Sequence, residues 1–373
     1  MRIFIDTTEL HQQDELKQLH WERLKTLADA QLVEMAVSAV TVSELVRQWT
    51  ERYTAKLAKL RTAWIEFAKL HAVGPIGAFD ATAFDVPTQA AAFRQRLLAR
   101  LAELNIEVIS LPGVTHHDVL ARDFASQKPF DREGKGYRDT LIWLSFLDWL
   151  ASGPPLQTIF VSNNARDFGQ NGFDASLAQD LDPFGTVAVS LRTNLSDEVE
   201  TLWEELDGEA LLAAVSEGDE EWGHDDAETA SLAAVENAAI FLIERNLTAP
   251  GSALDGIAVH GLEMPYWPEP LTINSIEFER DTFDLQLMED FGSGTQYFSA
   301  SIEASLDAVG LLPKGNAYIS GLAVIDQDFN QHYAEVELTF GCQIDFEVRY
   351  EEGDGGLAEA ELAKITWLPP ASD

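Results

Sequence analysis

Five polar residues in the first half of the chain are of types that can bind a divalent cation. Asp6 directly follows the apolar run "RIFI", and Glu44 follows the run "AVSAVTV". Asp139 lies in "KGYRDTLIWLSFLDWL", and Asn164 and Asp167 follow the run "TIFVS". Carboxylate and amide oxygens are ligands for hard cations such as Mg²⁺, provided that the fold brings them together. These five residues could therefore form a single cation-binding site.

Asp6 and Glu44 also have purely structural interpretations. A carboxylate after a strand can cap the helix that follows, so Asp6 is either a site residue or a cap. Thr41 and Glu44 have the spacing of a capping box, in which Glu44 only accepts a hydrogen bond from a backbone amide. The residues alone leave both alternatives open.

Asp139 is harder to explain as a surface charge. It shares a helical stripe with Ile142, Trp143, Phe146 and Leu150, at offsets of three, four, seven and eleven. A buried carboxylate needs a partner, since an unpaired one is protonated or very costly. That partner is either a cation at a functional site or a structural Arg.

A polar group lies at the end of the apolar run at 158–162, which is typical of a buried strand. Its members are Ser162, Asn163, Asn164 and Asp167. At the carboxyl end of a parallel strand these side chains would lie where ligands bind in open α/β sheets. The alternative is an Asx-turn with a helix cap, which the same residue types favour.

The elements that position these residues are strands alternating with helices. Apolar runs of strand type cover 2–5, 36–42, 106–111, 158–162 and 186–191, and helical spacing of apolar residues covers 43–70, 93–104 and 139–150. This order predicts an α/β domain with a mostly parallel sheet and helices on both faces. The carboxyl ends of parallel strands meet at one edge, which would gather the polar residues described above.

The chain changes character after Ser196. Acidic segments with a helical pattern lie within 197–246, and alternation typical of antiparallel strands covers 256–368. We predict two domains, an α/β domain at 1–195 and an acidic α+β domain with an antiparallel sheet at 196–373. The length of 373 residues agrees, because a single core usually supports fewer.

Charge is unevenly distributed between these two parts. The net charge is -38, with about 20 Lys and Arg against about 24 Asp and Glu in residues 1–195, and about 5 against about 39 in the remainder. The first part can accept a polyanion at a local basic patch, whereas the second repels one and suits a basic protein partner. With a single cysteine, no signal peptide and no apolar run of membrane length, the protein is expected in the cytoplasm.

The order of the motifs resembles that of the PIN-domain nucleases over about residues 1–195. The resemblance rests on "FIDTT", "KGYRD" and "FVSNNARDF", and it is strongest to a bacterial branch with a helical insertion between the second and third acidic positions. It implies a PIN-like fold in which Asp6, Glu44 and Asp139 bind Mg²⁺ or Mn²⁺. Many relatives have an aspartate at the fourth position, where this chain has Asn164 with Asp167 nearby. The resemblance therefore favours one bound ion over two.

Three further residues are candidates for binding substrate or orienting the site. Lys135 and Arg138 lie on either side of Gly136 and can neutralise a phosphate, although ordinary solvated charges are an equal alternative. Ser162 can orient a ligating aspartate by a hydrogen bond, or it can only cap a turn. A dehalogenase-type aspartyl-phosphate site is disfavoured, because Thr8 stands where that class has its second acidic residue.

The resulting hypothesis is a metal-dependent nuclease that hydrolyses phosphodiester bonds, first of all an endoribonuclease acting on RNA, with DNA as a second substrate. The alternative is a catalytically inactive PIN-like interaction protein whose acidic C-terminal domain binds a basic partner. Convergence of Asp6, Glu44 and Asp139 within reach of one ion would favour the nuclease.

Overall fold

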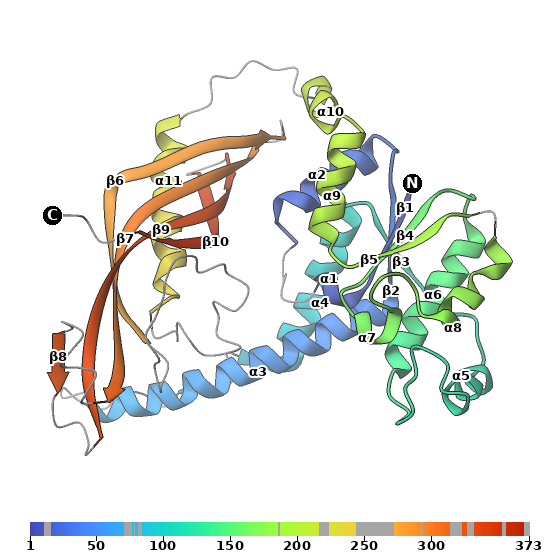
Figure 1. The fold of residues 1–373 in the computed structure, drawn as a ribbon, viewed down its shortest axis with the longest axis horizontal. Helices are drawn as coiled ribbons and strands as arrows, with labels where there is room; N and C mark the ends of the chain where they lie inside the picture. Colours follow the sequence, from blue (N-terminus) through green and yellow to red (C-terminus); the bar gives the residue numbers. More distant parts are fainter. Residues whose placement is uncertain are drawn as a thin grey trace. The chain divides into compact units, whose positions relative to one another are not determined.

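The structure is a computed structural model that places two compact units along the chain. It describes residues 1–10, 16–70, 77, 79–80, 84–185, 187–215, 224–243, 272–291, 294–313, 323–326, 332–352 and 356–368. The first unit is Met1–Leu211 and the second is Leu212–Asp373. Figure 1 shows the elements of both, and each unit is described by itself.

A five-stranded parallel sheet forms the centre of the first unit. Its strands are β1 (Arg2–Ile5), β2 (Glu34–Ser38), β3 (Ile106–Ile109), β4 (Thr158–Val161) and β5 (Val189–Arg192), in the order β3-β2-β1-β4-β5. Each neighbouring pair runs parallel, with Ile5 opposite Val37 on one side and Val161 on the other. The carboxyl ends of β1, β2 and β4 therefore lie side by side, as the sequence predicted.

Helices cover both faces of this sheet, as Figure 1 shows with α6 and α8 on one side and α2 and α9 on the other. The helices are α1 (Thr7–Leu10), α2 (Leu19–Asp29), α3 (Ala39–Leu70), α4 (Val86–Glu103), α5 (His116–Phe124), α6 (Tyr137–Ser152), α7 (Ala165–Phe168), α8 (Ala175–Asp180) and α9 (Leu195–Glu205), with a 3₁₀ turn at Asp182–Phe184. Helix α10 (Gly208–Val215) crosses the division between the two units at Leu211. Phe4, Phe146 and Phe160 pack their rings together between the sheet and α6. This α/β architecture confirms the predicted fold class.

The boundary between β2 and α3 differs from the prediction. The run 36–42 was expected to be a strand, but the strand ends at Ser38 and the helix begins at Ala39. The Ser38 hydroxyl accepts a hydrogen bond from the backbone amide of Val40 at 3.1 Å, which turns the chain into the helix. A short β-branched run is compatible with either a strand or a turn of buried helix. Here Val42 and Leu45 are buried three residues apart, which is the spacing of a helix.

The second unit contains an antiparallel sheet with one helix on it. The sheet has the order β10-β9-β7-β6, with β8 paired to β9, and is formed by β6 (Thr272–Asp290), β7 (Thr295–Pro313), β8 (Ala323–Asp326), β9 (Tyr333–Glu351) and β10 (Leu357–Trp367). Helix α11 (His224–Ile240) packs on one face, where Val235 and Ala239 join the core. The predicted antiparallel sheet is confirmed, and its predicted first part, 256–271, lies outside the described residues.

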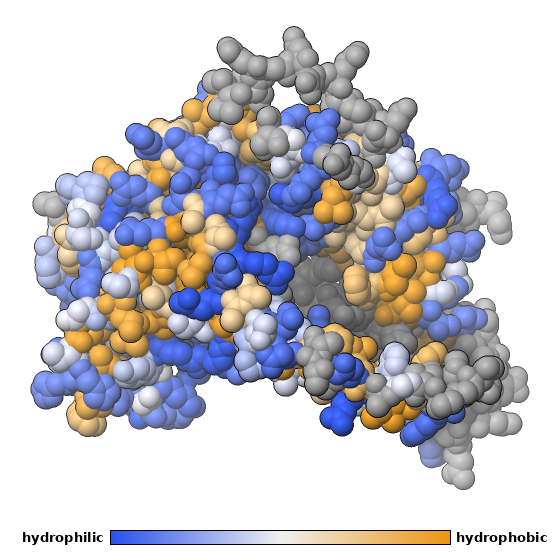
Figure 2. Space-filling model, turned by 180° about the vertical axis from the view of Figure 1, so that it is seen from behind, coloured by the Kyte–Doolittle hydropathy of each residue, from blue (hydrophilic) through white to orange (hydrophobic). Residues whose placement is uncertain are grey.

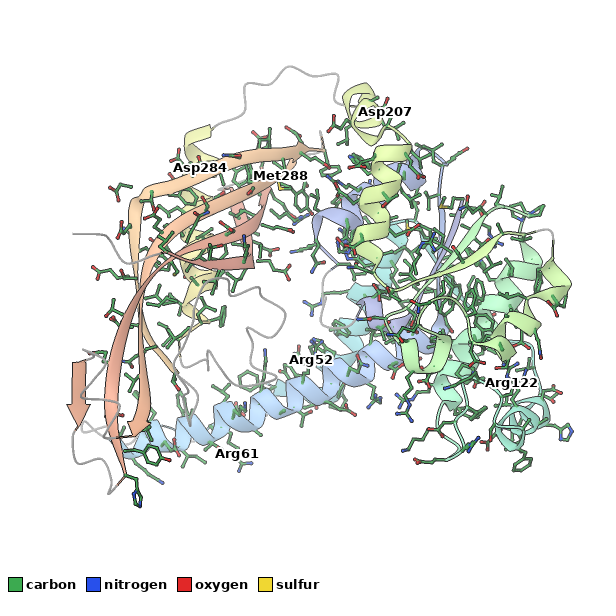
Figure 3. The ribbon with its side chains drawn as sticks, in the orientation of Figure 1. Arg52, Arg61, Arg122, Asp207, Asp284 and Met288 are labelled. Carbon is green, nitrogen blue, oxygen red and sulfur yellow. The ribbon has the colours of Figure 1, made fainter. Side chains whose placement is uncertain are left out.

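The two faces of this sheet have different chemistry. Ile302 and Ala304 of β7 and Ile344 of β9 are buried against the core, while alternating residues such as Asp307 carry polar groups. Ser275 and Thr339 donate hydrogen bonds to Asp307 at 2.6 and 2.7 Å, and these bonds lower the pKa of its carboxyl. Side chains of β6, among them Asp284 and Met288, are drawn in Figure 3.

Helix α9 belongs to the first unit, although its residues follow the division that the sequence suggested at 195. It contacts α2, where Arg23 forms an ion pair with Glu200 and lies over the ring of Trp203. Val199 and Leu202 are buried on the same helix. Figure 2 shows hydrophobic residues reaching the surface in several areas among hydrophilic ones. In the described part of the chain, no helix is long and apolar enough to cross a membrane.

Candidate functional site

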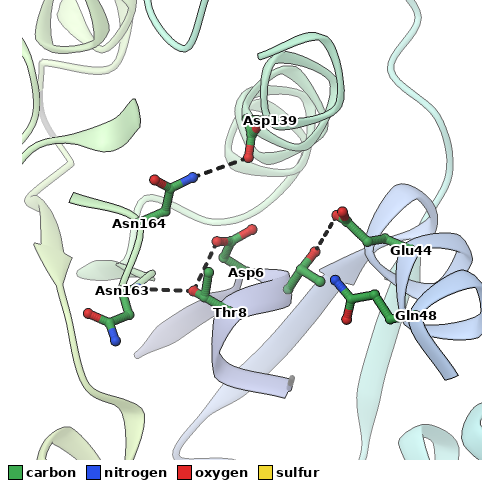
Figure 4. A pocket seen from close by; sticks show the side chains of 8 residues that line it. Asp6, Thr8, Glu44, Gln48, Asp139, Asn163 and Asn164 are labelled. Carbon is green, nitrogen blue, oxygen red and sulfur yellow. Dashed lines mark hydrogen bonds between the residues drawn. The ribbon is translucent and has the colours of Figure 1, made fainter. Parts of the chain in front are cut away.

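An acidic pocket of about 400 Å³ lies at the carboxyl edge of the parallel sheet (Figure 4). We call it the acidic pocket. Its lining comes from the chain after β1, from α3, from the first turn of α6 and from the chain after β4. The lining residues are Asp6, Thr7, Thr8, Glu44, Gln48, Asp139, Asn163 and Asn164. The fold therefore brings the predicted Asp6, Glu44, Asp139 and Asn164 to one place.

Asp6 lies at the bottom of this arrangement and is buried, with only 1% of its surface exposed. Its Oδ2 accepts hydrogen bonds from the hydroxyls of Ser162 at 2.7 Å and Thr8 at 3.1 Å. Its Oδ1 is buried and has no hydrogen-bond partner among the residues that the structure describes. Burial raises the pKa of Asp6, against the hydrogen bonds that lower it. A buried carboxylate with one oxygen left over is a group that needs a further partner.

Asp139 faces the pocket from the first turn of α6. The amide of Asn164 donates a hydrogen bond to its Oδ1 at 3.3 Å. Burial, followed by the negative charges of Asp6, Asp167 and Glu44, raises the pKa of Asp139 to about 6. A structural Arg partner was the alternative from the sequence, but the neighbouring Arg138 pairs with Glu44 instead. Like charges therefore dominate the surroundings of Asp139, and a cation would relieve them.

Glu44 lies in the second turn of α3, so its predicted alternative as a capping-box residue is wrong. The helix already begins at Ala39, and Thr41 faces Thr7 inside the fold. The Glu44 carboxylate accepts from Arg138 Nη1 at 2.6 Å on Oε1, and from the Thr7 hydroxyl at 3.3 Å on Oε2. Its side chain thus reaches the acidic pocket while part of its charge is neutralised by an arginine.

Asn164 occupies the fourth predicted site position with an amide in place of a carboxylate. Asn164 begins α7, but its side chain does not cap the helix; its Nδ2 bridges Asp139 and Asp167, at 3.3 and 2.9 Å. Asp167 is not part of the pocket lining, and its carboxylate lies 3.8 Å from the ammonium of Lys128. Ser162 joins this group to β1, because its hydroxyl donates to Asp6 and accepts from the backbone amide of Asn164 at 3.1 Å.

The two predicted cationic residues fall in different places. Lys135 is exposed and its ammonium pairs with Glu133 at 2.6 Å, away from the pocket lining. Arg138 forms an ion pair with Glu44, which lines the acidic pocket. Lys128 is a cation near Asp167 that the sequence did not suggest, because a loop far from the apolar strand ends carries it. Only tertiary structure brings it to the site.

Thr7, Thr8 and Gln48 also line the pocket without having been predicted as site residues. Thr8 fixes the turn after β1, because its hydroxyl donates to Asp6 and accepts from the backbone amide of Asn163 at 3.0 Å. The quoted motif "FIDTT" contains both threonines, so their position directly after the strand was an available signal. Gln48 is one helical turn after Glu44, and that spacing places both on one face of α3.

The oxygen atoms that line the acidic pocket are of the kind that a hard divalent cation prefers. Asp6 offers an unpartnered buried oxygen, and Asp139 is surrounded by negative charge. Within the described part of the chain, however, no three His, Cys, Asp or Glu side chains are grouped closely enough to hold an ion. Asp6 and Asp139 supply carboxylate oxygens to the pocket, while Glu44 accepts a hydrogen bond from Arg138.

Gly136 controls the position of the first turn of α6. Its φ of 109° is unfavourable for residues with a side chain, and a Cβ there would lie 2.3 Å from the carbonyl oxygen of Pro129. Replacing Gly136 with Ala is expected to lower the free energy of unfolding by more than about 2 kcal/mol, since both strain and a backbone clash are introduced. Urea unfolding measures this. Gly113→Ala is the control, because its Cβ would meet nothing nearer than 3.9 Å; equal stability of both variants would contradict the assignment.

Comparison with known proteins gives a match to a protein family. Residues 3–168 match a family whose description is PIN domain. No curated protein and no solved structure matches the chain. The matched segment runs from β1 to the end of α7, and it contains all of the acidic-pocket lining.

Proposed function

Residues 3–168 are a PIN domain, and on that premise we propose that the protein is a divalent-metal-dependent nuclease, an endoribonuclease that hydrolyses phosphodiester bonds in RNA. PIN domains as a family are metal-dependent nucleases. The observation that carries the proposal is the presence of buried Asp6 and half-buried Asp139 in one pocket. One has an oxygen without a partner, and the other has a pKa of about 6 because burial and like charges oppose its ionisation.

Asp6 and Asp139 would hold a single Mg²⁺ or Mn²⁺ ion, and Glu44 would become the third ligand by exchanging its contact with Arg138 for the ion. A bound ion of this kind neutralises charge on a phosphate oxygen and orients the water that attacks phosphorus. Ser162 and Thr8 fix the Asp6 carboxylate by donating to the same oxygen, which leaves the other oxygen directed away from them. Asn164 holds Asp139 in position through an uncharged amide, so it adds no further repulsion to the pocket.

The experiment that tests the proposal is cleavage of labelled single-stranded RNA and DNA by the purified protein. We expect hydrolysis of RNA with Mn²⁺ or Mg²⁺ and no hydrolysis with EDTA, because the phosphate and the two aspartates repel each other without a cation. Cleavage of DNA alone would change the substrate, and equal cleavage in EDTA would refute the metal dependence. A preparation with Asp6→Asn made in the same way excludes a contaminating nuclease.

A second candidate is a PIN scaffold that binds partners without catalysis. The pairing of Glu44 with Arg138 favours it, because a potential ligand is already neutralised. The acidic face of the sheet in the second unit would then bind a basic protein, as opposite potentials attract. This candidate predicts no hydrolysis with any metal, together with retained binding of nucleic acid or of a basic protein.

A further inference from the structure

A second cavity adjoins the acidic pocket and has no assigned role. It has a volume of about 450 Å³ and is lined by Val40, Ser43, Glu44, Arg47, Leu111 and Arg138. We call it the arginine pocket. Its walls come from the first turns of α3, from the chain after β3 and from the start of α6. Glu44 lines both cavities, so the two meet at this side chain.

Two guanidinium groups lie beside Glu44 in this cavity. Arg138 Nη1 is 2.6 Å from Glu44 Oε1, and Arg47 Nη2 is 3.6 Å from the same oxygen. Arg47 also pairs with Glu51 at 2.6 Å. About half of each arginine side chain is exposed, 47% for Arg47 and 53% for Arg138. A guanidinium has five N–H donors, so each can bind a phosphate oxygen while it keeps its contact with a carboxylate.

The arginine pocket also has an apolar wall of aliphatic side chains. Leu111, which follows β3, exposes 62% of its surface, and Val40 of α3 lines the same cavity. A large exposed aliphatic side chain beside two arginines has both kinds of group that a nucleotide requires: an apolar surface for the base or sugar and cations for the phosphate. The acidic pocket, in contrast, has a lining that is polar or charged throughout.

We propose that the arginine pocket binds the nucleotide next to the scissile phosphate. This inference rests on the proposed nuclease function and names a substrate subsite for it. The phosphate of that nucleotide lies between Arg47 and Arg138, and its base or sugar packs on Leu111. Because the cavities share Glu44, a strand with one phosphate in the acidic pocket has its adjacent nucleotide within reach of the arginines. The base must be unpaired to enter, since a stacked duplex base has no free face.

Binding measured without metal tests the subsite separately from catalysis. The probe is a fluorescent 12-residue oligouridylate, and its affinity is measured by anisotropy in EDTA at several salt concentrations. For Arg47→Gln combined with Arg138→Gln, the slope of log affinity against log salt should fall by about 0.7, since both arginines contact one phosphate and each phosphate contact to a single strand contributes about 0.7. Leu111→Ala should lower the affinity about fivefold with an unchanged slope, because it removes only apolar contact.

Arg61→Gln is the matched control. Arg61 lies on the same helix, α3, 14 residues beyond Arg47 or about 21 Å along the axis (Figure 3). Its loss should leave the slope nearly unchanged. An equal fall in the slope for Arg61→Gln would mean that only general charge is felt, and it would overturn the subsite. Urea unfolding of each variant shows that the change is not a loss of folded protein.

Cleavage assays on the same variants keep the two proposals distinguishable. If the protein cuts RNA with Mn²⁺ while the arginine and leucine variants bind like the parent, the subsite is wrong and the nuclease stands. If binding depends on the arginines and on Leu111 but no metal supports cleavage, the pocket stands as a nucleotide site and the nuclease is wrong.

Discussion

Replacing Asp139 with Asn is expected to reduce RNA hydrolysis at least about 100-fold while making the metal-free protein more stable. The lost rate corresponds to about 2.7 kcal/mol in the activation barrier, a modest value for a metal ligand. The gain in stability follows from the pKa of about 6, since the folded protein ionises this carboxyl against burial and against the charges of Asp6, Asp167 and Glu44. Asn has the same shape and can still accept the hydrogen bond from Asn164.

The sign of the stability effect follows from proton binding. A carboxyl with a raised pKa keeps its proton in the folded state at pH values where the unfolded chain has lost it. Stability therefore falls as pH rises from about 4 to above 6, by up to about 3 kcal/mol for a shift of about two units. Asp139→Asn removes this loss, so its advantage in EDTA should be present at pH 7.5 and small at pH 4.5. A variant that is less stable than the parent at pH 7.5 would show that Asp139 has a structural partner.

Asp6→Asn should lose RNA hydrolysis to the same degree as Asp139→Asn. It should not share the gain in stability that Asp139→Asn shows without metal. Its Oδ2 accepts from Ser162 and Thr8 at the bottom of the pocket. If Asn presents its carbonyl oxygen to these hydroxyls, its amide group occupies the buried place of Oδ1, which has no hydrogen-bond partner among the described residues. The two variants together separate loss of a ligand from loss of folded protein.

The position of the site could be predicted where its residues directly follow strands. Asp6 and Asn164 come after β1 and β4, which are neighbours in the sheet, so the carboxyl-edge rule for parallel sheets placed them together. Asp139 was recognised because a carboxylate on an apolar helical stripe must face the interior or a site. These inferences used local pattern together with one topological rule, and the matched family extends over the same residues.

The remaining features depend on contacts between distant segments. The run 36–42 satisfies both strand and helix patterns, and the hydroxyl of Ser38 together with packing decides where the helix begins. The pairing of Glu44 with Arg138 joins residues 94 positions apart, and local spacing instead suggested a capping box. Lys128 and Arg47 could not be predicted as residues near the site for the same reason. The local sequence around a charged residue does not indicate which distant residue it will contact.

Addition of Mn²⁺ or Mg²⁺ is expected to raise the melting temperature of the protein, and the rise should depend on pH. An ion that binds only the folded state adds about 2.7 kcal/mol at a hundredfold excess over its dissociation constant. Asp139 must be ionised to act as a ligand, and its pKa is about 6. The shift should therefore be small at pH 5 and approach its full size at pH 7.5, in contrast to a site built from ordinary exposed carboxylates, which are already ionised at pH 5.

Variants determine whether this stabilisation comes from the acidic pocket. Asp139→Asn should abolish the shift, and Asp182→Asn, an exposed aspartate on the 3₁₀ turn, should keep it. The control matters because about 39 carboxylates in residues 196–373 can also attract cations without a defined site. Such diffuse binding is screened by salt, whereas a partly buried ion is screened much less, so the shift should survive 0.3 M NaCl. A shift that persists in Asp139→Asn would place the ion outside the acidic pocket. The two aspartates would then be a repulsive pair that the fold tolerates without a metal, and the inactive interaction protein would become the better account of the chain.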